Sequence, residues 1–170
     1  IFTNAEAREK DNLYRKTLHN KEIKVFIEDV VDSTAEKKVD VKELKSDIET
    51  AFVTRGSANF KMVNDKKEAD MIITCSVNEN LWTADDPVDS ITGIGAVMFD
   101  AMAKSDYARM QAVFTVRDKS GKTIWEDTLK ATLTKNEMSE KDSVPLICER
   151  LAKVFIIECF SRSKSVRKGK

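Results

Sequence analysis

Two runs of residues, 107–118 and 123–134, restrict the fold of this chain more than any other feature. Apolar residues fall on one side of each run: Ala108, Met110, Ala112, Phe114 and Val116 in the first, and Trp125, Leu129, Ala131 and Leu133 in the second. Successive side chains of a strand point to opposite faces, so each run predicts a strand with one buried face. The link "KSGK" places Gly121 where a tight turn needs a positive φ. The two runs therefore predict an antiparallel hairpin.

Two other segments have the apolar spacing of amphipathic helices. The segment 39–56 has a capping pair in Asp40 and Glu43, and Gly56 is a stop signal at its end. The segment 144–160 has the same spacing without an internal break. The expected buried stripes are Val41, Leu44, Ile48, Ala51 and Phe52 in the first helix, and Ile147, Cys148, Leu151, Val154 and Phe155 in the second.

Three further segments, 23–31, 58–65 and 69–82, predict strands. The expected order of elements is β-α-β-β-(insertion)-β-β-α. Helices separated in this way can both cover one face of a single sheet. The sequence therefore predicts an α+β fold. It would be a two-layer sandwich, with a mixed or antiparallel sheet of about five strands and two main helices on one face.

The chain has 170 residues, which suits a single domain. We expect the α+β domain to extend over residues 23–161. Residues 1–22 would be an N-terminal linker, partly helical or disordered, and residues 162–170 a basic C-terminal tail. The tail carries no acidic residue, so it is either a solvated end or a weak contact with an anionic surface.

The charge balance argues against nucleic acid as a partner. The chain has 29 Lys and Arg residues against 29 Asp and Glu residues, so it has no overall positive field to hold a phosphate backbone. No run approaches the roughly 20 apolar residues of a membrane-spanning helix. We interpret Ile1, in place of Met, as a processed or trimmed start, so a missing targeting segment says nothing about the compartment.

Residues that usually carry catalysis or bind metals are sparse. His19 is the only histidine, and its polar neighbours predict a solvent-exposed side chain. The three cysteines lack metal-binding spacing, which favours buried free thiols, and the acidic stretch 85–89 lacks the spacing of a calcium loop. Glu126 and Asp127 fall on opposite faces of a strand and cannot act as a pair. We therefore expect no catalytic residue, no metal site and no cofactor.

The segment "SITGIGAVMFDAMAK", residues 90–104, is the strongest candidate for a functional surface. It lacks the Lys and Ser or Thr of a P-loop and the third Gly of a dinucleotide fingerprint. Its apolar residues predict contact with a partner or a membrane, or else a local core. Trp82, at its base, is either an anchor at a membrane boundary or a half-buried strand end. The candidate contact residues are Trp82, Ile91, Gly93, Ile94, Gly95, Val97, Met98, Phe99 and Met102.

These features together resemble one protein family. The segment order, the "GIGA" stretch, the hairpin "AVFTVRDKSGKTIWED" and the helix "SVPLICERLAKVFIIECF" are similar to the curli-export lipoprotein CsgG and its relatives. Those relatives include the Pel polysaccharide-export lipoprotein and the lipoprotein activators of penicillin-binding proteins. The similarity extends over residues 23–160, and the hairpin is its most specific part.

The resemblance implies a bacterial outer-membrane lipoprotein on the periplasmic side, with the anticodon-binding-domain-like α+β fold of the TolB N-terminal domain. Several members form rings that export a polymer, and none is an enzyme. By this resemblance the chain is a non-catalytic scaffold or component in envelope assembly or export, of polysaccharide or curli-like type. It would act as a homo-oligomer or with partner envelope proteins, and a lipid anchor outside this chain would hold it at the outer membrane.

The sequence departs from this family in two places. The acylated N-terminal cysteine of a mature lipoprotein is absent, and the stretch 82–106 is too short for the membrane-crossing hairpins of the curli pore. Two other functions therefore stay open. One is a monomeric lipoprotein adaptor or activator, of the lipopolysaccharide-transport (LptE) or cell-wall-synthase type. The other is a small metal-assisted hydrolase that would use Asp85, Asp86 or Glu126 with a cation.

Overall fold

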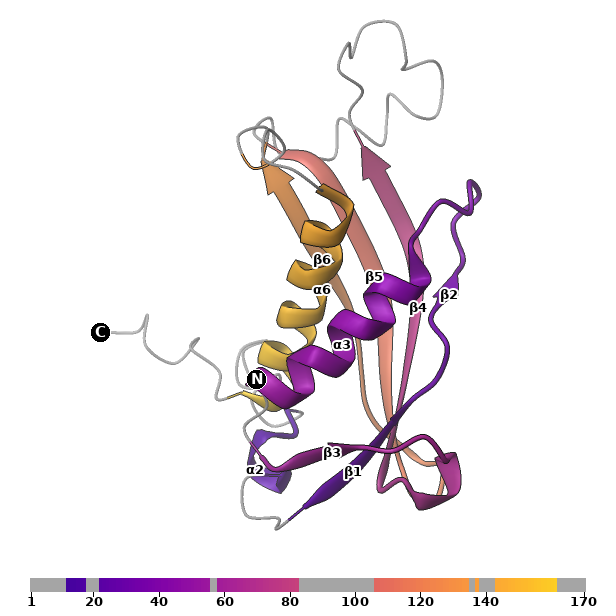
Figure 1. Cartoon of the computed structure of the whole chain (residues 1–170), viewed down its shortest axis with the longest axis vertical. Coiled ribbons are helices and arrows are strands. Elements are labelled where there is room, and N and C mark those ends of the chain that lie inside the picture. Colours follow the sequence, from indigo (N-terminus) through magenta and orange to yellow (C-terminus); the bar gives the residue numbers. More distant parts are fainter. Residues whose placement is uncertain are drawn as a thin grey trace, which may run out of the picture.

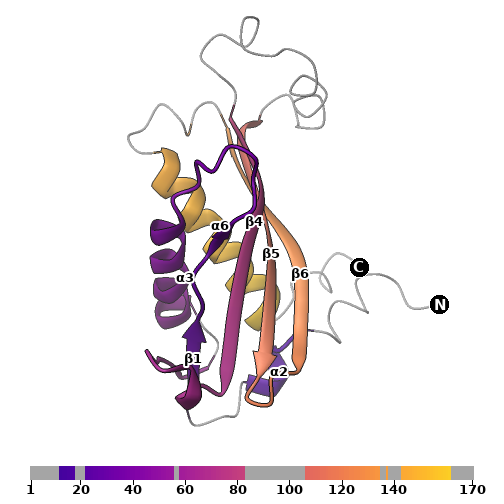
Figure 2. The same cartoon turned by 90° about the vertical axis from the view of Figure 1, so that its right-hand side faces the viewer.

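The computed structural model describes residues 12–17, 22–55, 58–82, 106–134, 137 and 143–161. Within them, strands form one mixed six-stranded sheet, and two long helices lie side by side on one of its faces (Figures 1 and 2). The helices are α3 (Val41–Arg55) and α6 (Ser143–Phe160), with the shorter α2 (Tyr14–Thr17) and the 3-10 turn η1 (Lys66–Glu68). The strands are β1 (Ile23–Ile27), β2 (Val31–Asp32), β3 (Phe60–Met62), β4 (Met71–Trp82), β5 (Asp106–Asp118) and β6 (Thr123–Thr134).

The predicted α+β fold is confirmed. The strand order is β3-β1-β4-β5-β6, and β2 pairs with β4 off this path. Strand β1 is parallel to β3 and β4, whereas β4, β5 and β6 are antiparallel. The predicted hairpin is β5 and β6, whose turn has Gly121 at a φ of 86°. Asp118 fixes this turn, because its Oδ1 accepts hydrogen bonds from the N–H groups of Ser120 and Lys122 at 2.9 and 3.1 Å.

The prediction of one continuous strand over 23–31 is wrong beyond Ile27. The chain leaves the ladder there and pairs with β4 again as β2, so the order becomes β-β-α-β-β-β-β-α. From the pair Ile27↔Ile73 to the pair Val31↔Ser76, the segment that contains β1 and β2 advances by four residues, whereas β4 advances by three. One extra residue cannot enter a regular ladder, so the pairing is interrupted as at a bulge.

The core lies between the helices and the inner face of the sheet. Phe155 of α6 lies at the centre of this core. The Phe155 ring stacks on Phe114 of β5 with ring centroids 4.4 Å apart, and its centroid lies within 6.0 Å of those of Phe52, Trp125 and Phe160. Asp40 begins α3 as predicted, because its Oδ1 accepts the N–H of Glu43 at 3.0 Å. The other sheet face carries polar side chains over β5 and β6, as expected of an antiparallel sheet with one face in water. They include Gln111, Thr115, Glu126, Thr128 and Lys130.

The segment 12–17 packs against the end of α6. Leu13 is fully buried, and its N–H donates to the carbonyl of Cys159 at 2.8 Å. The Asn12 amide donates to the carbonyls of Glu158 and Ser161. These contacts tie α2 to the core, while the predicted limits of linker, domain and tail stay predictions. None of the helices in the described ranges has the length and apolarity needed to span a membrane.

Candidate contact site at the end of the sheet

Trp82 is the last residue of β4. In Figure 1, β4 ends at the upper end of the sheet. The β4–β5 register shifts between Val77 and Glu79, which leaves Asn78 as an extra residue on β4. Beyond this bulge, Trp82 pairs with Ala108, a buried residue of the inner face. Without the extra residue, Trp82 would point to the outer face. The bulge therefore turns the indole toward the helix side of the sheet.

A cavity of about 590 Å³ lies beside Trp82. Its walls come from the end of β4, the connection 33–40 before α3, and Val144 in the first turn of α6. The indole N–H donates to Asn80 Oδ1 at 2.7 Å, so this polar group already has a partner within the chain. The lining residues are Ser33, Thr34, Ala35, Glu36, Lys38, Val39, Asp40, Asn78, Glu79, Asn80, Leu81, Trp82, Met110 and Val144.

Asp32 holds the connection that forms one wall of this cavity. Its Oδ1 accepts the N–H of Thr34 at 2.9 Å, and its Oδ2 accepts the N–H of Val39 at 3.0 Å. Burial opposes ionisation of this carboxyl, but these hydrogen bonds and the Thr34 hydroxyl outweigh it and keep the pKa of Asp32 below its usual value. The connection also contains Lys37 in the left-handed region, with a φ of 54°. The wall is thus a hydrogen-bonded turn of fixed shape.

Of the predicted contact residues, the structure places Trp82, which is half-buried at the strand end. The other eight lie outside the described residues and stay predictions: Ile91, Gly93, Ile94, Gly95, Val97, Met98, Phe99 and Met102. His19, Gly56 and the acidic residues Asp85, Asp86 and Asp89 also lie outside them.

The remaining candidates for chemistry are described. Glu126 is on the outer face and accepts the Thr115 hydroxyl at 2.9 Å, while Asp127 pairs with buried Phe114 on the inner face, so the two carboxylates point apart as predicted. Among the described side chains, no group of three or more His, Cys, Asp or Glu residues could hold a metal ion.

The three cysteines are buried and free, as predicted. Burial raises the pKa of Cys75 and Cys148 to about 12 and that of Cys159 well above its usual value. Each is therefore a protonated thiol at neutral pH. Buried, protonated thiols are poor nucleophiles, so these groups act as small apolar side chains in the core.

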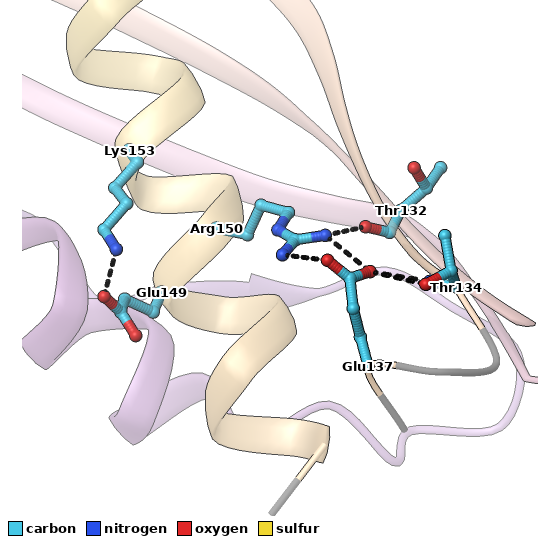
Figure 3. Close-up of polar contacts among 6 residues, drawn as sticks. All are labelled: Thr132, Thr134, Glu137, Glu149, Arg150 and Lys153. Carbon is cyan, nitrogen blue, oxygen red and sulfur yellow. Dashed lines mark hydrogen bonds and ion pairs between the residues drawn. The ribbon is translucent and has the colours of Figure 1, made fainter. Parts of the chain in front are cut away.

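Two ion pairs near this end of the sheet were missed from the sequence. Arg109 of β5 donates to Glu79 at 3.0 Å across the bulge, and both side chains are largely buried. Arg150 of α6 meets Glu137 with two hydrogen bonds, at 2.6 and 2.9 Å (Figure 3). Neither pair lies within one element, so no local periodicity could have indicated them.

The same class of two-layer α+β domain occurs among solved structures. No protein-family model matches the sequence, and no curated protein matches it. The PelC dodecamer from Paraburkholderia phytofirmans is similar, with a TM-score of 0.54 at 14% identity over 83% of this chain and 90% of that chain. A variant of that dodecamer gives 0.53 at 14% identity over 82% and 89%.

A weaker similarity is to the LpoB C-terminal domain from Salmonella enterica, with a TM-score of 0.42 at 7% identity over 77% of this chain and 100% of that domain. The two PelC structures show that this chain has a PelC-like fold. Identity of 14% shows the shared fold alone, and a shared role needs separate support.

Proposed function

We propose that this chain is a non-catalytic scaffold of a bacterial cell envelope, which works by assembling with copies of itself or with partner envelope proteins. The observation that carries this proposal is the PelC-like fold, which extends over 83% of the chain, together with the dodecameric state of PelC. The resemblance of the hairpin and the last helix to export lipoproteins supports the same role. The role in export of a polymer is part of this proposal.

The proposed contact surface comprises the cavity beside Trp82 and the apolar segment 91–102 that follows it in sequence. The cavity mixes apolar side chains such as Trp82 and Met110 with carboxylates such as Glu36. An apolar centre with a polar rim is the usual composition of a protein interface. Large apolar residues in a segment of this kind also favour a contact surface over a solvated loop.

We further propose that the scaffold lies on the periplasmic side of the outer membrane, held by a lipid anchor outside this chain. The support is the family resemblance. The cysteines agree with this location in one respect: the periplasm is oxidising, and free thiols persist there best when they are inaccessible. Cys75, Cys148 and Cys159 are all buried.

The test is the double substitution Met98→Asp and Phe99→Asp. We expect the purified wild-type chain to form a discrete oligomer in light scattering and the double variant to lose it, with an unchanged circular-dichroism spectrum. The matched control is Val53→Asp with Ile157→Asp, which adds the same charge at two exposed apolar positions of the helix layer. If the 98/99 variant assembles as the wild type does, residues 98 and 99 are not the contact. A wild-type monomer that captures one envelope partner would favour the adaptor function instead.

A further inference from the structure

Strand β6 forms one edge of the sheet and pairs with β5 alone among the described strands. In an antiparallel strand, the N–H and C=O of one residue point to the same side, and the side alternates along the chain. The Thr134 N–H donates to Glu137, and the Thr132 carbonyl accepts from Arg150. These bonds to side chains show that the even-numbered residues direct their backbone groups away from β5. The Thr128 N–H agrees, because it donates to the Asp127 carboxylate at 2.9 Å.

Side chains close the C-terminal end of this edge, at Thr132 and Thr134 (Figure 3). Arg150 Nη1 donates to the Thr132 carbonyl at 2.8 Å, and Glu137 Oε2 accepts the Thr134 N–H at 2.7 Å. The two side chains are joined to each other by two further hydrogen bonds. A strand that pairs with β6 must therefore end before Thr132. Within the described parts of the chain, the edge groups of residues 126–130 bond to no other element, so this stretch is where a partner strand can pair.

This stretch is complementary in charge to itself. On the outer face it presents Glu126, Thr128 and Lys130, which pair within the sheet with Thr115, Val113 and Gln111. We propose that residues 126–130 of β6 pair antiparallel with the same residues of a second copy of this chain, with Thr128 opposite Thr128. Glu126 of each copy then lies opposite Lys130 of the other, an opposite-charge pair that stabilises a sheet.

Other registers are disfavoured. A slide by two residues in either direction removes both Glu126–Lys130 pairs. A slide by four residues places Glu126 opposite Glu126 or Lys130 opposite Lys130, and like charges in direct opposition destabilise a sheet. A shift by one residue would place the helix layers of the two copies on opposite faces of the joined sheet. In the proposed register the two sheets become continuous, with their helices on the same side. In the unpaired chain, the Asp127 carboxylate accepts the Thr128 N–H. In the dimer, the Thr128 carbonyl of the second copy replaces this carboxylate as the acceptor.

In the proposed register, Thr128 lies on the two-fold axis that relates the two copies. A cysteine at this position tests the geometry. In a hydrogen-bonded antiparallel pair the two Cα atoms are about 5.5 Å apart, within the range a disulfide can bridge. We expect Thr128→Cys to form a disulfide-linked dimer under mild oxidation, measured on a non-reducing gel. The three native cysteines are buried, so cross-linking of the wild-type chain measures the background. Val53→Cys, on an exposed position of α3, is the matched control for random collision. Equal cross-linking of the two variants would overturn the proposal.

Charge reversal tests the register without a new bond. We expect Glu126→Lys alone and Lys130→Glu alone to weaken dimerisation roughly tenfold each in sedimentation equilibrium. The double variant restores the opposite-charge pairs and should dimerise nearly as the wild type does. A double variant no better than the single ones would overturn this register. The contact is independent of the proposed surface at 91–102, because Met98→Asp with Phe99→Asp should leave the Thr128→Cys cross-link intact.

Discussion

The carboxyl group of Asp47, on α3, gives the sharpest prediction of stability. Its Oδ2 is buried and accepts no hydrogen bond from any described residue. Burial, followed by the nearby carboxylates of Glu43 and Glu149, raises the pKa of Asp47 to about 6, and Lys153 opposes this only in part. The ionised form of Asp47 is therefore unfavourable in the folded chain. We predict that Asp47→Asn, which removes the charge, stabilises the protein at neutral pH.

The magnitude follows from the pKa. The rise from 3.8 to about 6 corresponds to roughly 3 kcal/mol for a fully buried group. Asp47 keeps partial access to solvent, which screens the charge and reduces the effect to about 1 kcal/mol. Because the folded state holds its proton more tightly, wild-type stability falls as the pH rises from about 4 to about 6. The variant lacks this fall, so its advantage should be absent at pH 4 and complete above about pH 6.5.

The assay is thermal or denaturant unfolding at a series of pH values. About 1 kcal/mol raises the melting temperature of a domain of this size by roughly 2–4 °C. The matched control is Glu158→Gln, which removes an exposed carboxylate of α6 and should show no such pH-dependent gain. The reasoning would be refuted if Asp47→Asn is no more stable than the wild type at pH 7.5. It would also be refuted if the gain in stability is the same at every pH.

Three further predictions concern other parts of the structure. Phe155→Ala removes the ring at the centre of the core and should cost about 4 kcal/mol of unfolding free energy, measured by denaturant titration; a loss under about 1.5 kcal/mol would contradict the packing. Gly121→Ala should cost about 1 kcal/mol, because a Cβ meets no atom within 4 Å and only the backbone at a φ of 86° is strained; an unchanged melting temperature would argue against this turn. Arg150→Gln should reduce the loss of stability that the wild type shows on acidification. Hydrogen bonds, first from the Arg150 side chain and then from the Thr134 N–H, lower the pKa of Glu137 from 4.5 to about 2, so the wild type loses stability as the pH falls through that range. An equal loss in the variant would contradict the pair.

Elements with long, clean periodicity were predictable from the sequence. The β5–β6 hairpin and the two long helices have apolar residues repeated at strand or helix spacing, and burial of one face imposes that repeat. Asp40 and Gly121 were also predictable, because a helix cap and a tight turn each restrict the residue type locally.

Features that depend on one extra residue were not predictable. The break before β2 and the bulge at Asn78 each shift the pairing by one residue, and no local pattern marks which residue is left out. The bulge decides the face on which Trp82 lies, so the geometry of the candidate site depended on it. The cap of Arg150 and Glu137 on β6 joins segments that meet only in the folded chain.

The mass of the purified wild-type chain in solution tests the central claim most directly. Light scattering over a wide range of concentrations should give one discrete species, several times the 19.2 kDa of the single chain, which Met98→Asp with Phe99→Asp reduces in size. A dimer that Thr128→Cys locks, and that the 98/99 variant leaves unchanged, would confirm pairing through β6 and contradict the proposed contact at 91–102. A monomer of 19.2 kDa at every concentration would contradict the self-assembling scaffold.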